Sequence, residues 1–197
     1  SSNDTFPTAM HVAILFAMRD TLPAIDKLIK SLGRKAKQFS KYKKVGRTHL
    51  MDALPVTLGS EFDAYVTSIT KSSHAIMYSK SQLEQVALGG TAVGTGANTP
   101  RGYRKKAIQE LSRISKLKLI EQKNMQHSLQ SKFAITSTSS TIRNLAIELG
   151  KISNDIRLMA SGPIAGLGEL EIPAVHAGSS IMPGKVNPSL AECMNMI

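Results

Sequence analysis

A chain of 197 residues with 42% apolar side chains can form one domain with a hydrophobic core, which excludes a disordered tail. No apolar run of about eighteen residues marks a membrane span, and the first residues do not follow a signal-peptide pattern. The formal charge of +11 favours anionic partners, while the one cysteine, Cys193, cannot form an internal disulfide and fits a reducing compartment.

Apolar residues recur at steps of three and four in three stretches, which predicts three long helices. The first runs from about residue 8 to 32, and Pro23 is expected to kink or divide it. The second covers residues 62–83, and the third covers 142–159 with an extension back to Leu129. Helices of roughly thirty residues are about 45 Å long and cannot bury every face in a small monomer. We therefore predict an all-α, long-helix bundle that includes partner chains.

Segments rich in glycine and proline separate these helices. The stretch "GGTAVGTG" (residues 89–96) fits neither common phosphate-loop pattern and follows no predicted strand, so we interpret it as a tight connection between helices. The sequence contains no internal repeat and no sign of a second domain. We expect residues 1–197 to be a central helical bundle domain that includes the "SSIMPGKVNP" loop, with flanking N- and C-terminal parts absent from this sequence.

The first residues, "SSNDTFPTAMH", carry hydroxyl and amide groups at a predicted helix start. Ser1, Ser2, Asn3 and Asp4 are good helix caps. The same groups, together with the free N–H donors of the helix, can also form an anion pocket. Both interpretations stay open on the residues alone.

A second polar segment, "GRTHLMDALP", contains Thr48 and His49 just before the second long helix, whose first turns are expected to include Pro55. Histidine titrates near neutral pH and is a common proton carrier, although a lone histidine is also a common structural residue. The other histidines lack metal-ligand spacing, so we expect no metal.

The third polar segment, "GSSIMPGKVNP" (residues 178–188), combines two serines, a lysine and an asparagine between glycines and prolines. Its glycines allow backbone N–H groups to converge on an anion. The segment is either a carboxylate or oxyanion site, or an ordinary glycine-rich turn.

The basic residues gather in residues 27–47 and 101–123. A nucleic-acid surface is one interpretation, because basic patches release counterions when they meet phosphates. Solvated helix ends, with a positive field that attracts small dianions, are the other. Aromatic residues make up 5% of the chain and no familiar nucleic-acid-binding motif occurs, so we expect neither a nucleic-acid nor a membrane partner.

Together, "SSNDTFPTAMH", "GRTHLMDALPVTLG", "ALGGTAVGTG", "NDIRLMASGPIAGLGE" and "GSSIMPGKVNP" resemble the class II fumarase and aspartase superfamily over nearly the whole chain. The resemblance implies a helical bundle that assembles into a homotetramer, with each active site built from three subunits. It also implies an enzyme without a cofactor that acts on a small dicarboxylate. Ile164 stands where arginine is common in this family.

The resemblance assigns roles residue by residue. Ser179 matches the general base that removes a proton from the carbon beside a carboxylate. His49 matches a residue near the reacting groups, paired with a carboxylate that matches Glu192. The residues that match substrate-binding positions are Ser1, Ser2, Asn3, Thr48, Lys185 and Asn187.

The implied reaction is reversible anti addition of water to fumarate, which gives malate through an aci-carboxylate intermediate and is a step of the tricarboxylic acid cycle. The alternative is aspartate ammonia-lyase activity, because "NTP" (98–100), "LMASGP" and Asn195 are similar to aspartases. More remote alternatives are an inactive helical scaffold and a basic nucleic-acid-binding protein. We expect a cytoplasmic enzyme, or a mitochondrial-matrix enzyme in a eukaryote, and we expect the 197-residue chain alone to be inactive.

Overall fold

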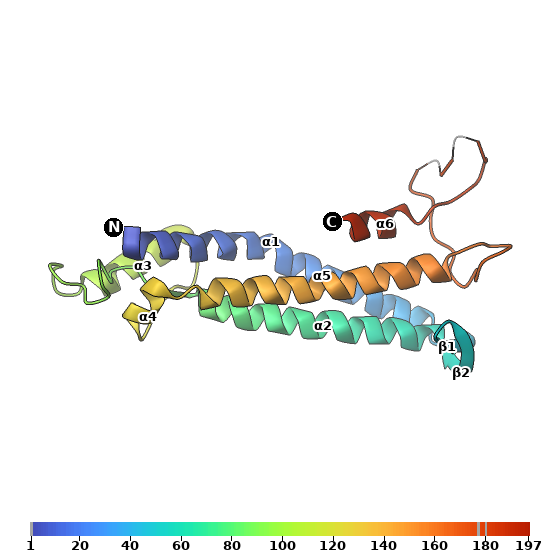
Figure 1. Cartoon of the computed structure of the whole chain (residues 1–197), viewed down its shortest axis with the longest axis horizontal. Helices are drawn as coiled ribbons and strands as arrows, with labels where there is room; N and C mark the ends of the chain where they lie inside the picture. Colours follow the sequence, from blue (N-terminus) through green and yellow to red (C-terminus); the bar gives the residue numbers. More distant parts are fainter. Residues whose placement is uncertain (1, 177, 180) are drawn as a thin grey trace. The chain divides into compact units, whose positions relative to one another are not determined.

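The computed structural model describes residues 2–176, 178–179 and 181–197. The chain divides into two units, residues 1–142 and 143–197. Long helices dominate, and Figure 1 shows α1, α2 and α5 as the main elements. The strands of the described residues form two sheets of two strands each. The predicted all-α bundle class is confirmed.

In the first unit, α1 (Ser2–Gln38) packs along α2 (Leu58–Leu83). The apolar stripe of each helix is buried, namely Leu15, Met18, Ile25 and Leu32 on α1 and Phe62, Tyr65, Ile69, Ile76 and Leu83 on α2. The structure extends the first helix beyond the predicted 8–32 at both ends, and Pro23 does not divide it. The stripe that predicted each helix is therefore the surface that joins the two.

A β-hairpin connects α1 to α2 and was not predicted. Strand β1 (Lys43–Thr48) pairs antiparallel with β2 (Met51–Thr57), with an irregularity between Val45 and Arg47. The prediction that Pro55 lies in the first turns of the second helix is wrong, because Pro55 lies in β2. Thr57 caps α2 instead, its hydroxyl accepting the backbone N–H of Ser60 at 3.0 Å.

The segment after α2 contains short elements: β3 (Gln85–Val86), α3 (Tyr103–Ser115), β4 (Ile120–Glu121) and α4 (Met125–Gln130). Strands β3 and β4 pair in parallel. Residues 89–96 therefore follow a strand of two residues, contrary to the prediction, although they do connect to a helix. Leu129 belongs to α4 and not to the third long helix, because extended backbone at Ser131 separates the two.

Helix α5 (Phe133–Met159) continues from the first unit into the second, and α6 (Ser189–Met196) ends the chain. Leu145, Ile152 and Met159 are buried at spacings of seven residues, as the predicted seam requires. Residues 160–188 form neither helix nor strand where they are described. Within the described part of the chain, every helix is too short or too polar to cross a membrane.

Candidate functional site

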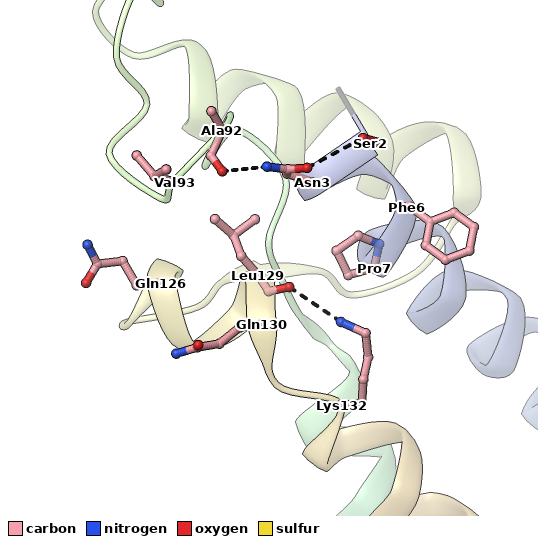
Figure 2. Close-up of a pocket in the computed structure, with 10 residues that line it drawn as sticks. All are labelled: Ser2, Asn3, Phe6, Pro7, Ala92, Val93, Gln126, Leu129, Gln130 and Lys132. Carbon is pink, nitrogen blue, oxygen red and sulfur yellow. Dashed lines mark hydrogen bonds between the residues drawn. The ribbon is translucent and has the colours of Figure 1, made fainter.

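Ser2 and Asn3, in the first turn of α1, lie at the edge of a cavity of about 600 Å³ (Figure 2). The Asn3 side chain donates an N–H to the Ala92 carbonyl at 2.7 Å, which ties this turn to the 89–96 segment. The Ser2 hydroxyl donates to Asn3 Oδ1 at 3.5 Å. Ser1, which was predicted beside them, lies outside the described residues.

The opposite wall of this cavity comes from the segment between α4 and α5. Figure 2 shows Gln126 and Gln130 on α4, and Lys132 with its ammonium directed toward the Leu129 carbonyl at 3.4 Å. Among the described residues that line the cavity, Lys132 is the one with a charged side chain. The cavity thus offers a cation, amides and a hydroxyl, which are the groups that bind carboxylates. The sequence carried no motif that pointed to Lys132.

His11, on α1, is buried against the end of α2. Its Nδ1 lies 3.1 Å from both the Leu83 and the Gln85 carbonyl oxygens, so Nδ1 must carry the proton. Burial lowers the pKa of His11 below its usual 6.5, and the positive charge of Lys132 acts in the same direction, while the two carbonyls oppose the shift. Through these hydrogen bonds, His11 joins α1 to the end of α2.

Thr48 and His49 lie at the turn of the β1–β2 hairpin. The pairing of Thr48 with Met51 leaves a turn of two residues, His49 and Leu50, whose φ angles are 54° and 63°. Two positive φ angles are typical of the tight turns that match the twist of a hairpin. The geometry exposes both Thr48 and His49 to solvent. The hairpin therefore presents this pair outward.

Contacts at its base hold the hairpin on the helices. Lys44 in β1 pairs with Glu61 in α2 at 2.8 Å. The rings of Phe39 and Phe62 contact edge to face, with their centroids 5.2 Å apart. A Cβ on Gly59 would lie 2.5 Å from the Ala36 carbonyl oxygen, so only glycine lets α1 and α2 approach this closely. The turn thus has a fixed place relative to the helix pair.

The Ser2–Asn3 turn and the Thr48–His49 turn do not meet within one chain. Helix α1 lies between them and has 37 residues, so at 1.5 Å per residue it is about 55 Å long. Figure 1 shows the start of α1 and the β1–β2 hairpin at opposite ends of this unit. A site that uses both pairs must take them from different copies of the chain.

In the second unit, the hydroxyl oxygen of Ser179 accepts two backbone N–H groups, from Ile181 at 3.2 Å and from Met182 at 3.1 Å. These two donors favour the form of the hydroxyl that carries negative charge, which a serine needs in order to act as a base. Ser179 is half-buried. The sequence suggested donors around this serine but not which amides supply them.

The ends of the Ser179 loop close on each other. The Asn187 amide donates to the Gly178 carbonyl at 2.7 Å, and a Cβ on Gly178 would lie only 1.8 Å from the Lys185 carbonyl oxygen. Gly178 is thus required for this closure. The side chain of Lys185 is exposed and borders a second cavity of about 490 Å³, together with Glu171. Ser179, Lys185 and Asn187 therefore lie on one loop whose two ends contact each other.

Glu192 lies in the first turn of α6, where its carboxylate is 3.7 Å from Arg157 on α5. On the same two helices, Asn195 donates to Asn154 at 2.8 Å. These contacts fix α6 on α5 within the second unit. The predicted partner of Glu192 is His49, which belongs to the first unit. The pairing of Glu192 with His49 therefore remains a prediction.

Across residues 2–176, 178–179 and 181–197, no group of three or more His, Cys, Asp or Glu residues could hold a metal ion. The single cysteine, Cys193, is exposed on α6. Ile164, at the position where arginine is common in the family, is 98% exposed.

A family model described as lyase matches residues 1–197. The chain belongs to the lyase family. It is 48% identical to the class II fumarate hydratase of Haemophilus influenzae over 198 residues, which cover 100% of this chain and 43% of that relative. The chain therefore spans less than half of the length of the curated relatives it matches.

Two solved structures share the fold of this lyase chain. The fumarate lyase:delta crystallin of Brucella melitensis superposes with a TM-score of 0.93 at 41% identity, covering 100% of this chain and 43% of that one. The class II fumarase of Schistosoma mansoni gives a TM-score of 0.93 at 35% identity, covering 100% of this chain and 44% of that one. The resemblance to the class II fumarase and aspartase superfamily is confirmed by these matches.

Proposed function

We propose that this chain is the central part of a class II fumarate hydratase, which interconverts fumarate and malate. The Ser179 loop carries the proposal, because it closes on itself and directs two backbone N–H groups at one serine oxygen. The identity of 48% to a class II fumarate hydratase supports the choice of reaction. We propose no cofactor.

In the malate-to-fumarate direction, the Ser179 oxygen takes a proton from the carbon beside a carboxylate. The electron pair of the broken C–H bond moves into that carboxylate and gives an aci-carboxylate intermediate. The pair then forms the C=C bond as the hydroxyl group on the neighbouring carbon leaves with a proton, as water. Lys185 and Asn187, on the same loop, stabilise the additional negative charge of the intermediate.

The other carboxylate of the dicarboxylate is bound by groups from other segments. The cavity at the start of α1 supplies the Ser2 hydroxyl, the Asn3 amide and the Lys132 ammonium. Ser1 is proposed to join them on the strength of the family resemblance. Thr48 and His49 contribute from the exposed hairpin turn, with His49 near the reacting groups and paired with Glu192.

We propose a homotetramer with active sites shared between subunits. The span of about 55 Å along α1 supports sharing, because it keeps the Asn3 turn and the His49 turn of one chain apart. Exposed apolar side chains on α5, such as Phe133 at 60% and Ile147 at 57%, offer surface for partner helices. The symmetric oligomer would bring three different segments to each site.

The length of the relatives supports a further proposal, that this chain is the central domain of a longer protein, with flanking parts on both sides. The chain alone is then inactive, and the full-length protein is the form to assay. We propose a cytoplasmic location, since the one cysteine fits a reducing compartment.

The test is a pair of assays on the purified full-length protein, one with malate and one with aspartate. Turnover of malate to fumarate without turnover of aspartate is expected. Turnover of aspartate alone would replace the proposal by aspartate ammonia-lyase activity. Turnover of neither, with the helical fold intact, would leave an inactive scaffold.

A further inference from the structure

A buried carboxylate holds the turn that contacts Asn3. Asp4 is 5% exposed, and its Oδ2 accepts the backbone N–H groups of both Gly89 and Thr91 at 3.1 Å. It lies in the first turn of α1, where the positive end of the helix dipole favours negative charge. The sequence pointed to Asp4 as a helix cap, but its carboxylate binds a turn that lies 85 residues away.

An arginine holds the same turn from another element. Arg104, in α3, donates from Nε to the Gly89 carbonyl and from Nη2 to the Gly94 carbonyl, both at 3.2 Å. Its remaining Nη1 pairs with Glu121 at 2.8 Å. The planar guanidinium donates in fixed directions, so these contacts determine where the turn lies relative to α3.

The turn has little freedom to shift between these two groups. Gly89 has a φ of 83°, and a Cβ at this position would lie 2.8 Å from the Cα of Arg104. Only glycine fits both the backbone conformation and the space. Ala92 lies within this fixed turn, and its carbonyl accepts the Asn3 amide at 2.7 Å.

We propose that Asp4 and Arg104 are positioning residues, which hold the 89–94 turn so that Ala92 orients the Asn3 amide for a substrate carboxylate. The inference rests on the proposed function, since it deepens the role of Asn3 there. Ala92 accepts one N–H of the Asn3 amide, so the second N–H is the one that a substrate carboxylate in the cavity would accept. Neither positioning residue touches the substrate.

Matched variants of the full-length protein separate this role from general stability. Both hydrogen bonds to Asp4 end on one oxygen, so Asp4→Asn keeps an acceptor for them and Asp4→Ala does not. Arg104→Met removes the second support, and Arg113→Met is its control, because Arg113 lies on the same helix with its side chain 71% exposed. Circular dichroism and gel filtration verify fold and assembly.

Asp4→Ala is expected to raise KM for malate about tenfold, because the substrate carboxylate loses one oriented hydrogen bond. The change in kcat is expected to be smaller. Asp4→Asn is expected to keep most of the affinity, and Arg104→Met to follow Asp4→Ala. In an Asn3→Ala background, Asp4→Ala is expected to add nothing, since its effect passes through Asn3. Hydrogen exchange of a peptide that covers residues 87–96 is expected to become faster in Asp4→Ala, but not in Asp4→Asn.

Three outcomes would overturn the inference while leaving the proposed function in place. The first is an equal KM for malate in Asp4→Ala and Asp4→Asn. The second is a double variant, Asn3→Ala with Asp4→Ala, whose increase in KM is the product of the two single increases. The third is unchanged hydrogen exchange of residues 87–96 in Asp4→Ala. If Asp4→Ala does not fold, the Arg104→Met and Asp4→Asn pair gives the same comparison. A parent protein without turnover of malate would refute the proposed function and this inference with it.

Discussion

Replacement of His11 by leucine tests the electrostatics of the helix pair through pH. In the folded chain, the His11 Nδ1–H donates to the Leu83 and Gln85 carbonyls, each at 3.1 Å. His11→Leu removes this donor from a buried site, and an unpaired buried carbonyl costs about 1–3 kcal/mol. We therefore expect the variant to be less stable than the parent by about that amount at pH 7.5.

The difference should shrink in acid. The pKa of His11 is lowered in the folded state, mainly by burial, so below about pH 6.5 the unfolded chain binds a proton that the folded chain does not. The stabilisation by neutral His11 is complete above that pH, and it is lost as the pH falls toward the folded pKa. His11 alone then lowers the free energy of unfolding of the parent by at most about 1.4 kcal/mol per pH unit. The leucine variant lacks this loss.

The assay is urea unfolding of the parent and the variant between pH 5 and 8, at one protein concentration because oligomers are stabilised by mass action. The other four histidines are present in both proteins. His74→Leu, at an exposed position on α2, is the matched control for a change from histidine to leucine. A stability difference between parent and His11→Leu that stays constant or grows toward acid would refute the reasoning.

Three further predictions concern the site and the core. Ser179→Ala in the full-length protein should lower kcat by about a hundredfold to ten-thousandfold, the contribution of a general base, while circular dichroism stays unchanged. Lys132→Met should raise KM for malate about tenfold, whereas Lys123→Met, outside the cavity, should not, and equal KM values would exclude a carboxylate at Lys132. Ile69→Ala, at a site with 0% exposure, should lower the free energy of unfolding by about 2–5 kcal/mol. Met77→Ala on the same helix, 56% exposed, should change it by about 0.5 kcal/mol or less, and similar losses from both would contradict the assigned core.

The sequence predicted the long helices because their apolar residues recur with a helical period, and many of these residues are buried in the structure. It did not predict the hairpin between α1 and α2. The turn at His49 and Leu50 lacks the glycine or asparagine that usually marks a turn with positive φ angles. Pro55 was misplaced because proline is common both in a first helical turn and in an edge strand.

The polar segments of the candidate site were visible as unusual residue types, but their contacts were not. The glycines of residues 178–188 predicted that backbone N–H groups could converge there, but not that the Asn187 side chain donates to the Gly178 carbonyl. The sequence predicts only a helix cap at Asp4, because nothing local shows that its carboxylate reaches Gly89. Contacts of this kind depend on how distant segments of the chain pack together. No short sequence pattern indicates that packing.

The central claim is that each active site takes the Ser2–Asn3 turn and the Thr48–His49 turn from different copies of the chain. Two full-length proteins test it, one carrying Ser2→Ala and Asn3→Ala, the other Thr48→Val and His49→Asn. Random mixing of subunits at equal amounts should leave about a quarter of the sites with both turns intact. We predict that the mixture, unfolded and refolded together, recovers about a quarter of the parent kcat/KM, although each variant alone is nearly inactive. A mixture no more active than the mean of the two variants would contradict the claim.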